Sequence, residues 1–324
     1  MDPQLPLFAS PGAGSSDEPL FDGWLRLRQT QSRPLRSSSI AVYRDMWTTI
    51  CRALGTRHVT ALRLGEGDLA AALQSIGGSA RYRKRLLSLL DAVLTAHGVA
   101  PERSAARVLL RTEEYRLADS REHERLPTIL NAFQQQTLLA KLSARMKEGS
   151  WKAQRDAAIA AVIFGGGVKP GEAITLQWNQ VVCADLDSVG GLRPFKLSLD
   201  GRVTAGGREA PLAGWAARVL ADWMLTYRAL GFRGDAVFPG TRCGGSAVGK
   251  HAFYRSFRSL LESLDIRVGT FGSHVLRHTF AVRQLAAHKD DAKRVVEVRD
   301  WMGLVRIESM QPYRRIVDER VIVV

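Results

Sequence analysis

Ser273-His274-Val275-Leu276-Arg277-His278-Thr279-Phe280 is the stretch of this 324-residue sequence that decides its fold. On a helix, His274, Arg277 and His278 stand at positions i, i+3 and i+4, so their side chains share one face. An arginine between two histidines on one face predicts a pocket for a phosphate, because a guanidinium donates two parallel hydrogen bonds to such a group.

Two other interpretations of the histidine pair are open. The spacing of His274 and His278 is also found among metal ligands, but no acidic third ligand follows at a suitable distance, so we expect no metal site. A structural role, in which a histidine caps a loop or fills a core, fits His278 better than His274.

The net charge of the chain favours a polyanionic partner. Forty-six Lys and Arg residues against thirty-two Asp and Glu residues give a formal charge of +14. Such an excess favours phosphate contacts with release of counterions, although net charge also serves solubility. Composition alone does not separate DNA from RNA or from an anionic membrane surface. The longest apolar run, Ala157 to Phe164, is far shorter than a bilayer span, so we expect no membrane helix.

Cysteine usage and the first residues of the chain indicate a reducing compartment. Cys51, Cys183 and Cys243 stand far apart and form no CxxC pair, which disfavours a disulfide framework or a zinc site. The chain begins without a basic segment followed by an apolar one, so we expect no secretory signal and a cytoplasmic location.

A helical domain is predicted over residues 18–111, after a disordered tail over residues 1–17 that is rich in Pro, Gly, Ser and Asp. One predicted helix of this domain, over 80–95, is strongly basic in its first turns. Its cations are Arg81, Arg83, Lys84 and Arg85. They are candidate DNA-contacting residues, and the alternative is a solvated charged face.

A second domain is predicted over residues 126–324, after a charged linker over 112–125 that is nearly free of apolar residues. Helices are predicted over about 130–146 and 154–164, and again from Trp215 onward. The alternating, glycine-bearing stretch 196–212 predicts a small antiparallel hairpin. The predicted fold class is therefore mainly α with a small antiparallel β-sheet.

The segment from His274 onward resembles the tyrosine recombinases, or phage integrases. His274, Arg277 and His278 are similar to the second signature box of that family. Tyr313 follows Arg277 by 36 residues (313 − 277 = 36). It also stands nine positions (313 − 304 = 9) after Leu304, which ends a Met-Gly-Leu tripeptide similar to the Leu-Gly-His of the family.

Upstream segments extend the resemblance to about residues 20–324. The stretches 155–164, 167–172 and 176–178 follow the layout of the first box of the family, and Leu126-Pro127 resembles the entrance to its catalytic domain. The N-terminal helical unit is similar to the core-binding domain that clamps the other side of the DNA. The chain is therefore identified as a divergent member.

The resemblance implies strand transfer on double-stranded DNA without a metal, ATP or another cofactor. Tyr313 is implied as the nucleophile that forms a 3′-phosphotyrosyl link, and Arg277 as a clamp on the phosphate oxygens. His274 is implied as a base or a second clamp, and Lys169 with Glu172 as the first-box cation and its supporting carboxylate. Other recombinase protomers, identical or different, are the implied protein partners on DNA.

Three positions depart from the family pattern. Lys169 replaces an arginine and lacks its planar fork. Leu304 ends the tripeptide where a histidine is usual and transfers no proton; Trp301 and His278 are candidates for catalytic support. The hairpin lysine that acts as general acid has no clear counterpart. Arg202 lies nearest to the expected turn, and it is a poor proton donor because its pKa exceeds ~12.

These departures leave several functions open. The leading interpretation is an active site-specific recombinase or integrase. The alternative is a recombinase-like subunit that binds DNA beside a partner recombinase and cleaves poorly, because losing one oxyanion donor costs on the order of 3 kcal/mol. A helical transcription factor or an RNA-binding protein would leave Tyr313 as an ordinary packed aromatic. The DNA target, and the choice among integration, excision, inversion and resolution, are not encoded in the motifs.

The last nine residues, 316–324, end in an apolar, β-branched run. In the family, the segment after the nucleophile often docks on a neighbouring protomer. The alternative is an edge strand added to its own domain.

Overall fold

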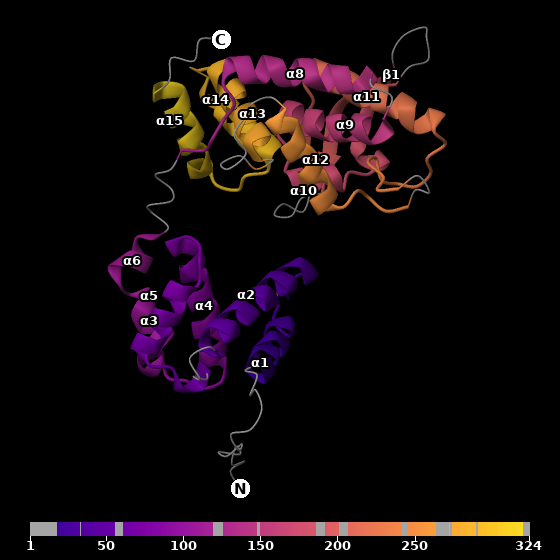
Figure 1. The fold of residues 1–324 in the computed structure, drawn as a ribbon. Coiled ribbons are helices and arrows are strands. Elements are labelled where there is room, and N and C mark those ends of the chain that lie inside the picture. The colour runs from indigo at the N-terminus through magenta and orange to yellow at the C-terminus, as the bar shows by residue number, and fades with distance from the viewer. Residues whose placement is uncertain are drawn as a thin grey trace. The chain divides into compact units, whose positions relative to one another are not determined.

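The chain divides into two units in a computed structural model of the protein, Met1–Arg125 and Leu126–Val324 (Figure 1). The structure describes residues 18–32, 34–55, 61–118, 126–147, 150–185, 192–200, 207–241, 245–263, 272, 274–289 and 291–319. The predicted tail over 1–17 lies outside these residues, as do 320–324.

The described part of the first unit consists of helices. They are α1 Glu18–Gln29, α2 Ser37–Gly55, η1 Ala61–Arg63, α3 Glu66–Ser75, α4 Ala80–Ala96, η2 Pro101–Arg103, α5 Ala105–Leu110 and α6 Glu113–Arg116. Leu86, Leu90 and Val93 recur at helical spacing on α4 and are buried against Phe21 and Trp47 of α1 and α2. This apolar face fixes which side of α4 carries its cations.

Residues 112–118 differ from the linker that the sequence predicts there. Glu113–Arg116 form α6, and the ring of Tyr115 is buried in the core of the first unit. Glu114 accepts a hydrogen bond of 2.9 Å from Arg83 of α4. The buried ring of Tyr115 and the ion pair of Glu114 therefore hold this charged turn against the first unit. The remainder of the predicted linker, 119–125, lies outside the described residues.

The second unit combines helices with one three-stranded sheet. Its elements are α8 Ala132–Lys147, α9 Trp151–Gly166, α10 Pro170–Ile174, η3 Trp178–Gln180, β1 Val181–Asp185, β2 Leu192–Leu199, β3 Arg208–Pro211, α11 Gly214–Ala229, α12 Lys250–Glu262, α13 His274–Ala286, α14 Ala292–Met302, η5 Ile307–Met310 and α15 Gln311–Glu319. The predicted fold class, mainly α with a small antiparallel sheet, is confirmed.

The sheet has the order β1-β2-β3, with both neighbouring pairs antiparallel. Lys196 pairs with Pro211 and Leu199 with Arg208, so the predicted hairpin over 196–212 is present. β1 and the first residues of β2 were not predicted, because β1 is too short for its alternation to be read. The register of this hairpin brings Arg208 to the start of β3.

Helix α9 lies at the centre of the second unit. Residues 154–166 of this helix are all buried, as expected of a helix that is apolar on nearly every side. It packs against α8, α11 and α13 (Figure 1). The helix ends at Gly166, and the next residue, Gly167, caps it in a left-handed conformation with φ +63°. The chain turns there into the segment that carries Lys169 and Glu172.

Among the described residues, no helix is long and apolar enough to cross a membrane.

Candidate active site

Helix α13 presents His274, Arg277 and His278 on one face, as the sequence predicts. The ring centroids of the two histidines are 6.1 Å apart. Arg277 is only 3% exposed, whereas His274 lies exposed at the first residue of the helix. Packing of α13 against α9, α14 and α15 encloses the arginine.

The guanidinium of Arg277 joins the ends of two other helices. Its Nη1 donates to the carbonyl oxygen of Gly167 and its Nη2 to that of Met302, both at 2.6 Å. These carbonyls terminate α9 and α14, where the helix dipole places partial negative charge. Burial lowers the pKa of Arg277 to about 10, so it stays protonated at neutral pH. A guanidinium has five N–H groups, so these two bonds leave donors for a further anion.

Tyr313 of α15 reaches the same face of α13. Its hydroxyl oxygen lies 2.9 Å from Nδ1 of His278, and the two ring centroids are 5.7 Å apart. Burial raises the pKa of Tyr313, against the opposing charge of Arg277. Burial, together with the neighbouring His274 and Arg277, lowers the pKa of His278 to about 4. Phenol and imidazole are therefore both neutral near pH 7. When the imidazole carries its proton on Nε2, its Nδ1 accepts a hydrogen bond from the hydroxyl of Tyr313.

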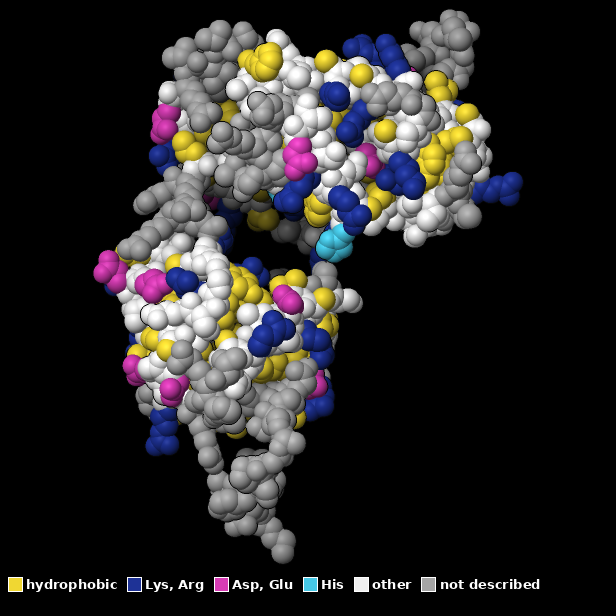
Figure 2. Space-filling model, viewed as in Figure 1, with side chains coloured by type: hydrophobic (Ala, Val, Ile, Leu, Met, Phe, Trp, Pro, Cys, Tyr) yellow, Lys and Arg dark blue, Asp and Glu magenta, His cyan; other side chains and the backbone are white. Residues whose placement is uncertain are grey.

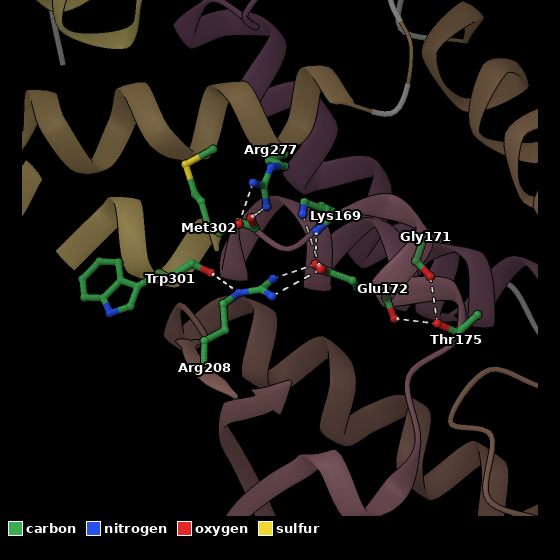
Figure 3. A network of polar contacts seen from close by, with 9 residues as sticks. Lys169, Gly171, Glu172, Thr175, Arg208, Arg277, Trp301 and Met302 are labelled. Atoms are coloured by element: carbon green, nitrogen blue, oxygen red, sulfur yellow. Dashed lines mark hydrogen bonds and ion pairs between the residues drawn. The ribbon is translucent and has the colours of Figure 1, made fainter. Parts of the chain in front are cut away.

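Glu172 lies on α10, beside Lys169, and holds a cation that the sequence analysis missed. Its carboxylate accepts two hydrogen bonds from Arg208, at 3.2 and 2.6 Å, and one of 2.9 Å from the backbone N–H of Lys169 (Figure 3). Burial alone would raise the pKa of Glu172, but these bonds outweigh it and the pKa is lowered. The side-chain nitrogen of Lys169 lies 3.9 Å from the same carboxylate.

Lys169 also acts on His274. Desolvation of its imidazole by the surrounding protein, followed by the charges of Arg277 and Lys169, lowers the pKa of His274. The four residues predicted from the two boxes, His274, Arg277, Lys169 and Glu172, thus meet in one electrostatically coupled cluster. Arg277 interacts electrostatically with both Tyr313 and Glu172, which connects this cluster to the phenol.

The candidates for catalytic support lie in different places. The indole of Trp301 contacts Phe280 and the guanidinium of Arg294, and only the backbone carbonyl of Trp301 joins the polar network (Figure 3). Leu304 packs against the small apolar cluster around Met302 and Tyr313. Arg202 lies outside the described residues. The side chain of Leu304 therefore lies in an apolar environment, and the indole of Trp301 is engaged by Phe280 and Arg294.

The four cations predicted to contact DNA lie along the first turns of α4. Arg81 and Arg85 are exposed, and Lys84 is half-buried. Arg83 binds Glu114, and this hydrogen bond raises its pKa. Lys and Arg side chains are visible in several places on the drawn face of both units (Figure 2). Arg83 is thus held by an ion pair within its own unit.

Within the described ranges, no group of three or more His, Cys, Asp or Glu side chains is arranged to hold a metal ion. The site is thus built from three cations, two imidazoles, one carboxylate and one phenol. Sequence reasoning found all of them except Arg208, whose only signal is its place on the predicted hairpin.

A family model described as the phage integrase family matches residues 129–320, more than half of the chain. A search of curated proteins found no match. Several solved structures have a similar fold. A Tn1549 transposon integrase in complex with transposon right end DNA is 12% identical, with a TM-score of 0.61 over 91% of this chain and 94% of that one.

Two further structures are similar over most of their length. XerH site-specific recombinase bound to palindromic difH substrate is 16% identical, with a TM-score of 0.55 and coverage of 94% of both chains. A lambda integrase dimer bound to a COC′ core site is 16% identical, with a TM-score of 0.55 over 92% of this chain and 76% of that one. At these identities the likeness concerns the fold.

Proposed function

The chain belongs to the phage integrase family, and from this premise we propose that it cuts and rejoins DNA strands through Tyr313. The phenol oxygen attacks a backbone phosphorus, the bond from phosphorus to the 5′ oxygen breaks, and a 3′-phosphotyrosyl link remains beside a free 5′-hydroxyl. The reverse attack by a 5′-hydroxyl rejoins a strand. The energy of the phosphodiester is kept in the covalent intermediate, so no cofactor is needed.

One observation carries this proposal: the hydroxyl of Tyr313 lies 2.9 Å from His278 on the helix that also holds Arg277. Nucleophile and proton acceptor are within hydrogen-bonding distance, as general-base catalysis requires. Arg277 uses two of its five N–H groups on carbonyl oxygens, so others are proposed to bind the phosphate, and Lys169 and His274 add positive charge or hydrogen bonding beside it. His278 thus takes the role of proton acceptor that the family resemblance implies for His274.

The test is trapping of the covalent intermediate. A duplex with a nick close to the cleavage point loses the short leaving strand, so a cleaved complex cannot religate and accumulates. The duplex is built from candidate sites in the DNA that flanks the gene. We expect a protein–DNA adduct that resists denaturant with the wild-type chain and is absent with Tyr313→Phe. Equal amounts of adduct with the wild-type chain and with Tyr313→Phe would overturn the role of Tyr313.

A second candidate function is a DNA-binding subunit that cleaves poorly beside a partner recombinase. Two observations favour it: Leu304 places an apolar side chain where a proton-transferring group is usual, and Tyr313 is only 6% exposed. This function predicts salt-sensitive binding to a specific site without a trapped adduct. Adding a cleavage-competent partner would then restore strand transfer on a shared site.

Assembly on DNA is part of the same proposal. The lambda integrase named above is a dimer on its core site. We propose that copies of this chain, or this chain and a partner recombinase, occupy adjacent half-sites. Gel-shift titrations with one and two half-sites test it: cooperative filling of the second half-site is expected, and independent filling contradicts it.

The exposed cations of α4 are proposed to contact the phosphates of the DNA. Replacing Arg81 and Arg85 together by Gln removes two charges without touching the bond between Arg83 and Glu114. Each lost phosphate contact lowers the slope of log affinity against log salt by about 1. An unchanged slope would show that this face of α4 is merely solvated.

A further inference from the structure

Arg208 stands at the start of β3 and connects three separate segments of the second unit. Its Nη1 and Nη2 donate to the two carboxylate oxygens of Glu172 on α10. Its Nε donates to the carbonyl oxygen of Trp301, near the end of α14, at 3.1 Å. All three bonds use the planar fork of a guanidinium, which a lysine at this position does not possess.

The same guanidinium lies directly against the turn that ends α14. Gly303 adopts a left-handed conformation there, with φ +62°. A Cβ added to Gly303 would lie 2.8 Å from Cζ and Nε of Arg208, which is closer than real Cβ atoms approach. Arg208 therefore packs on the backbone of the Met302-Gly303-Leu304 tripeptide, without an intervening side chain.

Arg208 and Arg277 together fasten the end of α14. Trp301 and Met302 offer adjacent carbonyl groups, and each accepts from a different one of the two arginines. The other bonds of these arginines lead to Glu172 and Gly167, at either end of the segment 167–172. Figure 3 shows this arrangement, with the two guanidiniums on either side of the 301–302 backbone and the carboxylate of Glu172 beside Arg208 and Lys169.

The end of α14, which the two arginines hold, leads along the chain to Tyr313. After Gly303, the chain forms η5 and then α15, which carries Tyr313. η5 packs against α14, and α15 packs against η5 and α13. A shift of the α14 terminus relative to α10 therefore changes the position of Tyr313 relative to Lys169 and Arg277.

We propose that Arg208 is a positioning residue for the strand-transfer site, holding the turn before Tyr313 in register with the Glu172 and Lys169 segment. This inference rests on the proposed function for its catalytic consequence. Its structural part, the fixation of residues 301–313 by Arg208, is independent of whether the chain cleaves DNA.

The first measurement is amide hydrogen exchange of the full-length protein. We expect Arg208→Gln to speed exchange in peptides that cover 301–313 by about tenfold or more, because a fastened turn now opens locally. Peptides of α12 should exchange at the wild-type rate, which separates a local loss of fixation from general destabilisation. Lys196→Gln is the matched control, because it removes an ion pair with Glu209 on the same sheet. Unchanged exchange in 301–313 would overturn the inference, even if the wild-type chain shows no cleavage.

The second measurement is the rate of adduct formation at saturating DNA, beside the affinity for the same DNA. A misplacement of about 1 Å costs roughly 100-fold in rate, so Arg208→Gln should lose about that factor while its affinity for DNA stays unchanged. Arg208→Lys should recover only part of the rate, because one ammonium does not bridge Glu172 and Trp301. A wild-type rate in Arg208→Gln would overturn the inference and leave the proposed function intact. Absence of the adduct in the wild-type chain would count against the proposed function alone.

Discussion

The hydroxyl oxygen of Tyr313 lies 2.9 Å from Nδ1 of His278, although 35 positions separate the two residues in the sequence. The tyrosine comes from α15 and the histidine from the second turn of α13, so the contact depends on the packing of these two helices. It pairs a phenol whose pKa is raised by burial with an imidazole whose pKa is lowered by burial. Both groups are therefore neutral near pH 7.

Removing the imidazole of His278 should slow cleavage. In His278→Phe, a ring of similar size keeps the packing, while the imidazole nitrogen that lies 2.9 Å from the Tyr313 hydroxyl is lost. General-base assistance contributes typically 10²–10⁴-fold, so we expect the rate of adduct formation to fall by about 100-fold or more. Affinity for the nicked duplex, measured in parallel, should not change. Adduct formation at the wild-type rate would exclude His278 as the proton acceptor.

The stability of the protein should decrease as the pH falls from about 6.5 toward 4. In the unfolded chain, His278 takes up a proton near its ordinary pKa of about 6.5, whereas the folded protein resists protonation until about 4. Between these values the unfolded state binds more protons, so the free energy of unfolding falls with decreasing pH by at most about 1.4 kcal/mol per pH unit for this group.

Urea unfolding at several pH values, with wild type and His278→Phe compared, measures this contribution. The free energy of unfolding of the variant should depend less steeply on pH, so the difference between the two curves should change as the pH falls from about 6.5 to 4. His274 contributes in the same direction in both proteins, because its pKa is also lowered. Parallel curves would show that His278 is not the group responsible.

Replacing Lys169 by an arginine should accelerate the proposed cleavage. Lys169 precedes α10 and keeps its ammonium 3.9 Å from Glu172, beside His274. Lys169→Arg retains the charge and adds the planar fork that binds two phosphate oxygens at once. We expect a gain of about tenfold in adduct formation, which corresponds to about 1.4 kcal/mol of transition-state stabilisation. Lys169→Gln is the matched loss-of-charge variant and should be slower than wild type. A slower Lys169→Arg would mean that the local geometry is adapted to an ammonium.

Most residues of the candidate site could be predicted from the sequence, whereas Arg208 and the contact between His278 and Tyr313 could not. Helical periodicity places His274, Arg277 and His278 on one face whatever surrounds them. The choice of Tyr313 depends on the family resemblance, which implies a tyrosine at that interval. Periodicity does not tell which of the two histidines meets that phenol, because this depends on how α15 packs on α13. Arg208 enters through the register of β2 and β3, which is set by non-local pairing.

The extent of the helical first unit was misjudged for a related reason. The stretch 112–118 looks like a linker because it is charged, and charge patterning carries no information on tertiary partners. Tyr115 inserts into a core built by residues far from it, and Glu114 finds Arg83 across a distance of 31 positions. Neither contact can be predicted from the residues next to it in the sequence.

A methyl group at Gly167 should destabilise the second unit and disturb the site. This glycine has φ +63°, and an added Cβ would overlap the ring of Phe280 on α13. Overpacking in a dense core costs typically about 1–3 kcal/mol, and the left-handed conformation adds about 1–2 kcal/mol for a residue other than glycine. We expect Gly167→Ala to lower the midpoint of thermal unfolding clearly.

Gly171→Ala is the matched control for this prediction. Gly171 lies in α10, four residues away, and an added Cβ would meet no atom within 4 Å. Alanine is also the better helix former, so this variant should be as stable as wild type or slightly more stable. Equal unfolding midpoints for the two alanine variants would show that the close approach of Gly167 to Phe280 does not limit the stability of the second unit.

The two carbonyl bonds of Arg277 make the chemistry depend on complete folding. Gly167 and Met302 belong to helices that are far apart in the chain, and the arginine acquires both acceptors only when α9, α13 and α14 have closed around it. Until then its cation has neither fixed neighbours nor a defined direction. A nascent or partly denatured copy therefore lacks an assembled site, and we expect damage to the fold to reduce the number of molecules that carry out the proposed strand transfer.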